Sequence, residues 1–576
     1  MSDNNQKFKI CLTMAGAVSA GAFTAGVMDY LLETLELWEK AKEKNRALTP
    51  AHGDYDFSLP MHEVEIDVIS GASAGGIVGS LALLHAVDPH HQPLNRENPL
   101  GRNNRFYQTW VTMADDEKSD TLQKLLDTTD LKKLKKGEKP KALLNATPID
   151  DLANTALKLG ETQAYPNYIS KGLDLIMTTT NLRGINFKID FGGNAHSGAT
   201  ITNHGGFFRY KLANKYYKPG IPRGSDLYYV LDLNRQQDMQ ALKEATLSTA
   251  AFPIGLPSRE VSISQEYINR YPKYLFGTST GIEPIRTNNP IYTFNSIDGG
   301  IINNEPFAIA LKVLREKAPL SWLKEQYAVI MIDPFANKDQ EQEDENPVAD
   351  VITVAKGMFK ALRNQVMFNR DGILDALSAS NSSRFLIEPV RKSFQFDELL
   401  RIKNDLATAP LFGFAGFIDQ SFRQHDYELG RQNCQSFLRY YFVLSEAELI
   451  KKLGAMPHEM AMDRFFVHTH ADKNGRHFPI VPDIRVLNAR LNRFDADNYG
   501  ADAALDYPDY PSISTAEFNK KYKKAIRKRM EMLSNILVSN FWFSLANKLF
   551  IRNRLSKEIE REILDELRYA GLIKDD

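Results

Sequence analysis

The chain has 576 residues, of which 43% are hydrophobic and 25% are charged, as in an ordinary soluble globular protein. Its formal net charge of −1 excludes a global attraction to nucleic acid or to anionic membranes, so any such contact must be local. The two cysteines, Cys11 and Cys434, are too few for a disulfide-stapled secreted fold and favour a reducing compartment. We therefore expect a cytoplasmic protein without nucleic-acid partners, built from several domains or from one elaborated domain.

The first third of the chain alternates strand-like and helix-like segments. A strand over Phe8–Met14 is followed by a loop rich in small residues and by a helix over about Ala22–Lys44. A polar loop then precedes a second strand over Glu63–Ser70. This order predicts a largely parallel sheet that helices cover.

A nucleophilic serine is indicated directly after the second strand. The sequence Gly71-Ala72-Ser73-Ala74-Gly75 has the G-x-S-x-G pattern and lies between that strand and an apolar helix. Glycines allow the sharp, strained turn that presents such a serine. Polar side chains within residues 66–87 make a membrane span unfavourable there, so a strand, a turn and a helix are expected instead.

The loop after the first strand is the candidate source of hydrogen-bond donors for an oxyanion. Its small residues would let the backbone N–H groups of Gly16, Ala17 and Val18 approach a substrate oxygen closely. A dinucleotide-binding loop is the alternative interpretation. The G-x-G-x-x-G pattern fails because Val18 stands in place of its second glycine, so we expect no cofactor.

Residues 88–140 differ in composition from the segments on either side. They are rich in His, Pro and Asn and then in Lys, which predicts a surface insertion with a short helix around Phe106–Ala114. Beyond them the sequence predicts a helix over Met239–Thr249. It also predicts further strands over Leu173–Thr180, Gly206–Leu212, Ile291–Ile297, Tyr327–Ile332 and Ser383–Ile387.

The base that activates the serine has two candidate origins. Asp298 follows a predicted strand and precedes Gly299-Gly300, which would let a carboxylate turn toward a neighbouring loop. To act directly on a serine it must be within hydrogen-bond reach and partly desolvated. The alternative is a Ser–Asp–His triad, for which the late histidines are His425, His458, His468, His470 and His477.

These motifs together resemble the patatin-like phospholipases, and in particular their larger bacterial members. The similarity covers about residues 8–335 and rests on five stretches: Gly16–Val27, Gly71–Gly75, Glu244–Pro253, Asp298-Gly299-Gly300 and its continuation to Pro306. One departure concerns the first loop, where the family usually has a glycine run followed by arginine. Here Ala17, Val18 and Ala20 occupy those positions.

The resemblance implies a three-layer α/β/α fold with a mostly parallel central sheet. Beyond the acidic stretch Asn337–Pro347 the sequence itself predicts a mainly helical C-terminal extension. It implies a carboxylic ester hydrolase of the phospholipase A or lysophospholipase type, acting on lipid or phospholipid without metal or cofactor. Ser73 would attack the ester, and Asp298 would take its proton as the other half of a Ser–Asp dyad. A catalytically silent lipid-binding or scaffold protein on the same fold is a further alternative.

We expect a catalytic domain over residues 6–335, an extension over 336–450 that completes the sheet or forms a cap, and a mainly helical region over 451–576. In the extension, the aromatic segment Phe412–Phe417 is expected to pack on the core or to form a lid. The basic Lys520–Arg529, followed by the aromatic Ile536–Leu545, either packs on the catalytic domain or lies on an anionic membrane. The histidines around Thr469 lack a metal-ligand pattern.

Overall fold

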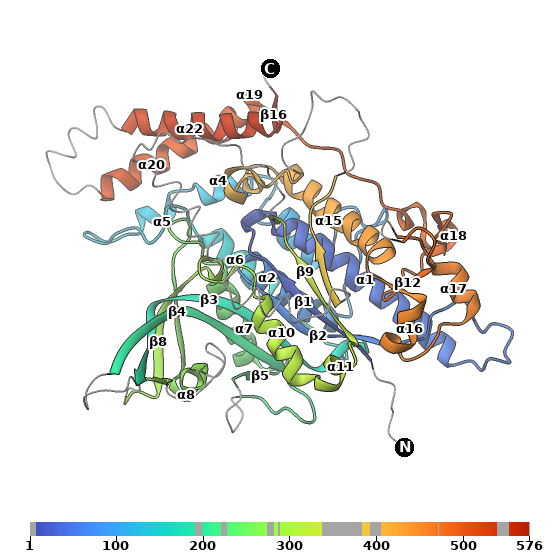
Figure 1. Cartoon of the computed structure of the whole chain (residues 1–576). Helices are drawn as coiled ribbons and strands as arrows, with labels where there is room; N and C mark the ends of the chain where they lie inside the picture. The colour runs from blue at the N-terminus through green and yellow to red at the C-terminus, as the bar shows by residue number, and fades with distance from the viewer. Residues whose placement is uncertain are drawn as a thin grey trace, which may run out of the picture.

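The computed structural model describes residues 7–190, 198–220, 227–272, 282–285, 288–336, 383–391, 405–469, 472–537 and 552–574. Within these ranges ten strands form one central sheet (Figure 1). They are β1 (Phe8–Met14), β2 (Val64–Gly71), β3 (Ile169–Asp190), β4 (Gly198–Leu212), β5 (Tyr229–Leu231), β6 (Arg259–Ser264), β7 (Ile282–Pro284), β8 (Ile291–Ile297), β9 (Tyr327–Ile332) and β10 (Arg384–Ile387).

The part of the sheet that carries the candidate nucleophile is parallel. Its order is β10-β9-β1-β2-β3, and each neighbouring pair runs in the same direction. The strands β1, β2 and β9 are buried along almost their whole length. Continuous burial of apolar strands is typical of a parallel sheet that is covered on both faces.

Helices α2 (Ala74–Val87) and α10 (Phe307–Lys317) cover opposite faces of this parallel part. The side chain of Ile69 lies toward Gly79 of α2, whereas the Ser70 hydroxyl donates to the carbonyl of Pro306, directly before α10. Consecutive residues of a strand point to opposite faces, so the two helices lie on opposite sides of the sheet. The predicted three-layer α/β/α fold with a mostly parallel sheet is thus confirmed.

The remaining strands are mainly antiparallel and bring β8 to the candidate site. β3 pairs antiparallel with β4, and β8 pairs antiparallel with both β3 and β6. β3 runs well past the predicted end at Thr180, with a register shift between Thr180 and Ile185. The polar continuation of β3 is held by its cross-strand partners, which a local sequence pattern does not reveal. In Figure 1, β3 and β4 curve together away from the parallel strands.

The other helices and short helical turns of the first 335 residues connect these strands. They are η1 (Val18–Ala20), α1 (Gly21–Arg46), α3 (Arg105–Tyr107), the π-helical turn η2 (Gln108–Thr112), α4 (Thr121–Leu125), α5 (Thr129–Lys132), α6 (Thr147–Ala156), α7 (Gln236–Thr249), α8 (Gln265–Asn269), η3 (Gly299–Ile301) and α11 (Pro319–Leu323). The described helices include none long and apolar enough to cross a membrane.

The interval 88–140 is not uniformly at the surface, which corrects the expected surface insertion. Phe106, Tyr107 and Trp110 are buried in the main core, where the Trp110 ring lies close to Gly21 at the start of α1. Only the lysine-rich end of the interval is consistently exposed. The prediction failed because it was based on the polar composition of the whole interval, in which these three buried aromatic residues carry little weight.

Beyond residue 383 the described chain is mainly helical, as predicted. It contains α14 (Pro410–Gly413), η6 (Ala415–Phe417), α15 (Gln420–Tyr440), α16 (Glu446–Leu453), α17 (Glu459–Phe465), α18 (Ala496–Tyr499), η7 (Ala501–Ala503), α19 (Thr515–Phe518), η8 (Asn519–Lys523), α20 (Lys524–Leu537) and α22 (Arg552–Tyr569). The short strand pairs are β11 (Val443–Ser445) with β12 (His477–Pro479), β13 (Val486–Asn488) with β14 (Arg493–Phe494), and β15 (Ile513–Ser514) with β16 (Ile573–Lys574).

Buried ion pairs attach this C-terminal part to α1, the first long helix of the chain. Arg431 of α15 pairs with Asp29 and Glu33 of α1, and Arg485 pairs with Glu33 and Asp483. The guanidinium groups are almost fully covered, so each depends on its carboxylate partners. The strand β10 also pairs in parallel with β9 at the edge of the sheet. The division into three domains stays a prediction, and residues 337–382 and 392–404 lie outside the described residues.

A second hydrophobic cluster lies under α20 and α22. It joins residues from three distant parts of the chain: Leu126, Ala407, Ala415, Ile418, Phe422, Ile513, Phe518, Tyr522, Ile526, Leu567, Ala570, Leu572 and Ile573. The apolar side of the basic segment Lys520–Arg529 therefore packs on the protein. Arg529 itself is buried and pairs with Asp130 of α5 at 2.9 Å. Residues 538–545 of the expected aromatic helix lie outside the described residues.

Candidate active site

Ser73 occupies a tight turn between β2 and α2. Its backbone has φ 50° and ψ −118°, a conformation that is strained for a residue with a Cβ. The flanking glycines make the turn possible, since a Cβ on Gly71 would collide with the backbone of Gly75 and a Cβ on Gly75 with Met14. The predicted strand–turn–helix arrangement around Ser73 is thus the one that the structure contains.

Asp298 reaches Ser73 from the end of β8. The Ser73 hydroxyl donates to Oδ2 of Asp298 at 2.5 Å, although 225 residues separate them in sequence. The other carboxylate oxygen, Oδ1, accepts the N–H of Gly300 at 2.7 Å. The backbone N–H of Asp298 donates to the carbonyl of Ala251, which fixes the residue to the segment after α7. Both carboxylate oxygens therefore have a donor, and one of these donors is the hydroxyl of Ser73.

Burial makes the Asp298 carboxylate a stronger base than an exposed aspartate. The residue is 4% exposed, and among the described residues its carboxylate forms no ion pair. Desolvation raises its pKa from 3.8 to about 6, while the hydrogen bonds from Ser73 and Gly300 act in the opposite direction. A carboxylate with this pKa is ionised at neutral pH and close to the operating range of a general base.

The hydroxyl of Thr249 holds the backbone of Ser73. The N–H of Ser73 donates to Oγ1 of Thr249 at 2.9 Å, and Thr249 is fully buried at the end of α7. Sequence reasoning placed Thr249 in a family-like helix but gave it no role. The sequence did contain a signal for this role, because the helix ends at a residue with a hydroxyl group, shortly before Phe252-Pro253.

Replacing Thr249 with valine is expected to lower kcat for a soluble ester about tenfold or more while KM changes little. The change would leave the Ser73 N–H buried without its acceptor and would loosen the strained turn. Thr249→Ser should restore most of the rate because it keeps the hydroxyl. Thr246→Val is the matched control, since Thr246 is buried on the same helix but bonds Leu242 and Ser80 instead. Equal losses in both valine variants would show a general disturbance of α7 and contradict this role.

The loop after β1 faces the nucleophile through Gly16. A Cβ on Gly16 would lie 2.6 Å from Oδ1 of Asn304 and 3.0 Å from Cβ of Ser73, so a side chain at this position would crowd both residues. The N–H of Gly16 donates to the carbonyl of Asn304 at 3.3 Å, which occupies one of the three expected oxyanion donors. In the described structure, the N–H groups of Ala17 and Val18 donate to no protein acceptor. Val18 has φ 49°, which is unusual for a β-branched residue.

A segment from the C-terminal part covers this loop. The Ser19 hydroxyl donates to the carbonyl of Gly413 and accepts the N–H of Gly416 at 3.1 Å. The ring of Phe414 packs edge-on against Phe252, with ring centroids 5.1 Å apart. The aromatic segment Phe412–Phe417 therefore lies against both the candidate donor loop and Phe252, whose neighbour Ala251 accepts the N–H of Asp298. Ser73 itself is buried, with 6% of its surface exposed.

The late histidines in the described part of the chain make their contacts elsewhere. Nδ1 of His425 lies 2.7 Å from Asp426, and His458 accepts the N–H of Met460 at the start of α17. His468 and His477 both contact the carbonyl of Gly475. His470 lies outside the described residues. Among the residues that the structure describes, no group of three or more His, Cys, Asp or Glu side chains could hold a metal ion.

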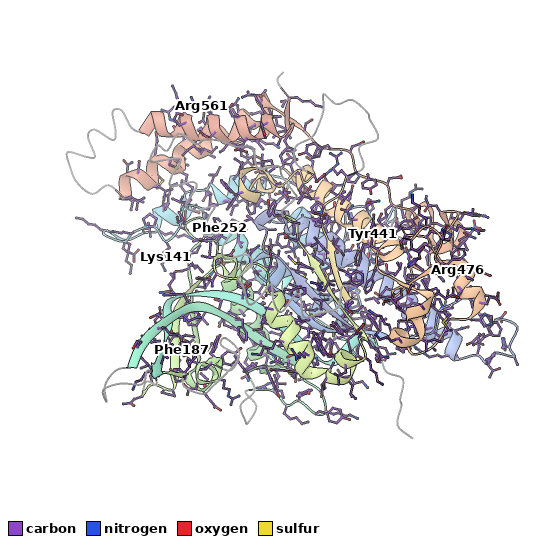
Figure 2. All side chains as sticks on the ribbon, in the orientation of Figure 1. Lys141, Phe187, Phe252, Tyr441, Arg476 and Arg561 are labelled. Carbon is purple, nitrogen blue, oxygen red and sulfur yellow. The ribbon has the colours of Figure 1, made fainter. Side chains whose placement is uncertain are left out.

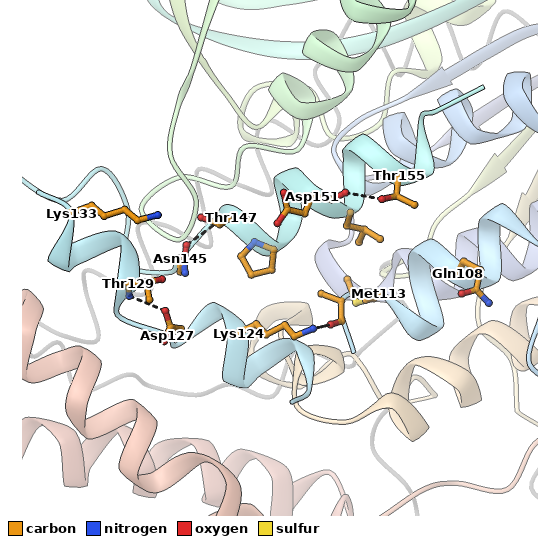
Figure 3. A pocket seen from close by; sticks show the side chains of 13 residues that line it. Gln108, Met113, Lys124, Asp127, Thr129, Lys133, Asn145, Thr147, Asp151 and Thr155 are labelled. Atoms are coloured by element: carbon orange, nitrogen blue, oxygen red, sulfur yellow. Dashed lines mark hydrogen bonds between the residues drawn. The ribbon is translucent and has the colours of Figure 1, made fainter. Parts of the chain in front are cut away.

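A groove of about 550 Å³ lies between α4, α5 and α6 (Figure 3). Lys124 and Lys133 line it together with Asp127 and Asp151, so its charges are mixed. Neither Ser73 nor Asp298 is among its lining residues. The groove is therefore a feature of the interval 88–140 and its surroundings, separate from the candidate nucleophile.

Comparisons with known proteins find similarity to a protein family and to a relative along almost the whole chain. A family model described as patatin-like phospholipase matches residues 12–311, which include Ser73 and Asp298. An uncharacterized protein, y4iI, from Sinorhizobium fredii is 29% identical, with 98% of this chain and 82% of that protein covered. The crystal structure of VipD from Legionella pneumophila is 11% identical with a TM-score of 0.18, over 98% of this chain and 92% of that one. Because the family model spans more than half of the chain, the chain belongs to the patatin-like phospholipase family, which implies lipid acyl hydrolase activity.

Proposed function

We propose that the protein is a serine acyl hydrolase that cleaves fatty-acyl esters of lipids or phospholipids through Ser73 and Asp298. The observation that carries this proposal is the 2.5 Å hydrogen bond from the Ser73 hydroxyl to a buried carboxylate that forms no ion pair among the described residues. A nucleophile with its base already in hydrogen-bond contact is the arrangement that covalent catalysis requires. The contacts of the described histidines elsewhere favour this dyad over a Ser–Asp–His triad.

In the acylation step, Oγ of Ser73 attacks the carbonyl carbon of the ester while its proton moves to Oδ2 of Asp298. The carbonyl oxygen becomes an oxyanion, and the tetrahedral intermediate then collapses with cleavage of the bond to the alcohol oxygen. Asp298 returns its proton to this leaving oxygen. The products are the free alcohol, such as a lysophospholipid or glycerol derivative, and an acyl group bound to Ser73.

We assign the oxyanion to backbone N–H groups on the two sides of Ser73. Ala17 and Val18 are the donors left in the loop after β1, because the N–H of Gly16 is bonded to Asn304. Ala74 is the first residue of α2, where N–H groups have no acceptor within the helix. The positive end of the α2 dipole adds to the stabilisation. Backbone donors do not require glycine, so the altered loop sequence is compatible with this role.

In the deacylation step, Asp298 removes a proton from a water molecule that attacks the acyl carbon. The second tetrahedral intermediate collapses, the proton returns to Oγ of Ser73, and the carboxylic acid leaves. Asp298 thus acts as base and then as acid in each half of the cycle. The overall reaction adds one water to one ester and needs no metal or cofactor.

The substrate class can be determined with the purified full-length protein. Phospholipids with different acyl chains at the two positions, lysophospholipids, triglycerides and a short nitrophenyl ester would be supplied separately, and fatty acid release measured by mass spectrometry. We expect release from at least one lipid class, and the identity of the released chain will show the positional preference. Hydrolysis of none of these esters by folded protein would contradict the proposed activity.

A further inference from the structure

A lysine-rich segment projects from the interval 88–140. It has lysine at positions 132, 133, 135, 136, 139 and 141, whereas glutamate occurs only at 138. All six lysines are exposed, and none forms an ion pair within the described structure. A solvated surface segment usually mixes both signs of charge, so this one creates a local positive field on a protein whose net charge is −1.

The segment is fixed to the protein next to the candidate active site. At its start, Asp130 pairs with the buried Arg529 of α20. At its end, the N–H of Leu143 donates to the carbonyl of Ile254 at 2.8 Å, and the N–H of Leu144 donates to Gly255. Figure 2 shows Lys141 near Phe252, which contacts Phe414 of the covering segment. The end of the lysine-rich segment therefore lies beside residues 252–255, against which Phe414 packs.

Three large apolar side chains are exposed in this region. Phe412 is 85% exposed, Ile254 is 74% exposed and Leu143 is 43% exposed. Phe412 and the preceding Leu411 both have φ 58°, so the backbone is held in an unfavourable conformation that turns this apolar residue outward. These apolar side chains accompany cations that form no ion pair among the described residues, and apolar and cationic side chains together are what binding at a membrane surface uses.

We propose that these lysines together with Leu143, Ile254 and Phe412 form a docking surface for an anionic lipid bilayer. The surface of an anionic bilayer has negative charge spread over many headgroups, with hydrocarbon a short distance below them. Flexible lysines can bind the headgroups while single apolar side chains enter the hydrocarbon. An acidic protein would instead require cations held in a fixed geometry that matches its own carboxylates. Six exposed lysines on one segment do not have such a geometry. This inference rests on the proposed function, because the role of docking would be to bring bilayer lipids close to Ser73.

The proposal is testable by vesicle co-sedimentation of the full-length Ser73→Ala protein, which keeps the lipids intact. Vesicles of phosphatidylcholine alone are compared with vesicles that contain an equal part of phosphatidylglycerol. We expect binding to the anionic vesicles only, weakened by high salt. In the same background, Lys135→Glu/Lys136→Glu should lower the partition constant at least about tenfold. Phe412→Ser/Ile254→Ser should lower it as well, and the residual binding should then disappear at high salt.

The matched control is Lys44→Glu/Lys473→Glu, which makes the same charge change at two exposed lysines far from this surface. Circular dichroism and thermal unfolding show whether each variant is folded. Equal losses of binding in the test and control variants would overturn the proposal. Absence of binding to either kind of vesicle would also overturn it, and would leave an acidic protein as the partner of this surface. Because binding is measured without turnover, a failed docking surface is distinguishable from a failed hydrolase.

Discussion

Replacing Ser73 with alanine is expected to lower kcat for ester hydrolysis by roughly 10⁴-fold or more. The reason is that no other hydroxyl is hydrogen-bonded to the Asp298 carboxylate in the described structure, so the acyl-enzyme cannot form by this route. The protein should stay folded, because alanine fits the backbone conformation at least as well as serine does. Hydrolysis of a soluble ester and of the preferred lipid, followed under saturating substrate, provides the measurement.

Ser80→Ala is the matched control for this change. Ser80 is also buried in α2, but its hydroxyl bonds the carbonyl of Gly76 and the hydroxyl of Thr246 rather than Asp298. We expect the Ser80 variant to keep most of its activity. Undiminished turnover by the Ser73→Ala protein would show that another nucleophile performs the reaction.

Asp298→Asn is expected to lower kcat by about 10³- to 10⁴-fold, since an amide cannot accept the serine proton. The asparagine side chain can keep both contacts, with Oδ1 accepting the N–H of Gly300 and Nδ2 donating to Oγ of Ser73. The geometry of the site should therefore survive while the base is lost. Recovery of wild-type activity in this variant would contradict the assigned role of Asp298.

The pH dependence of activity provides a second readout for Asp298. Its pKa is raised to about 6 by burial, and only the ionised carboxylate can accept the proton of Ser73. The kcat/KM for a soluble ester should therefore fall as the pH is lowered through about 6. The residual activity of Asp298→Asn should lack this inflection. A wild-type profile that is flat between pH 5 and 8 would contradict the pKa assignment.

The same pKa predicts that Asp298 costs stability at neutral pH. Because its folded-state pKa lies above the unfolded value of 3.8, the folded protein retains a proton that the unfolded chain has lost between about pH 4 and 6. Stability from this group therefore declines as the pH rises through that window. The rise from 3.8 to about 6 corresponds to roughly 3 kcal/mol at most. Asp298→Asn should consequently unfold at a higher denaturant concentration than wild type at pH 8, and at a similar one at pH 4.

The two residues of the proposed dyad were predictable from the sequence because a local motif surrounds each of them. Gly71–Gly75 lies between an apolar strand and an apolar helix, and Asp298 lies between β8 and a pair of glycines. The strands Ile291–Ile297 and Tyr327–Ile332 begin and end where predicted. Ser73 and Asp298 come together because β2, which precedes Ser73, pairs with β3, and β8, which precedes Asp298, also pairs with β3.

The supporting contacts were not predictable, because they join residues far apart in the chain. The bond from Ser73 to Thr249 spans 176 residues, and the bond from Ser19 to Gly413 spans 394. The hydrogen bond from Gly16 to Asn304, which narrows the candidate oxyanion donors, is likewise invisible to local patterns. Composition also predicted a surface position for the interval that contains Trp110, whereas the Trp110 side chain is buried.

Labelling with a fluorophosphonate probe tests the assignment of Ser73 most directly. Such a probe reacts with a serine only when that serine is activated, and the adduct can be located by peptide mass spectrometry. We expect a single adduct on the peptide that contains Ser73, absent from Ser73→Ala and much slower to form in Asp298→Asn. An adduct on a different residue, or no labelling of folded wild-type protein, would contradict a Ser73–Asp298 hydrolase.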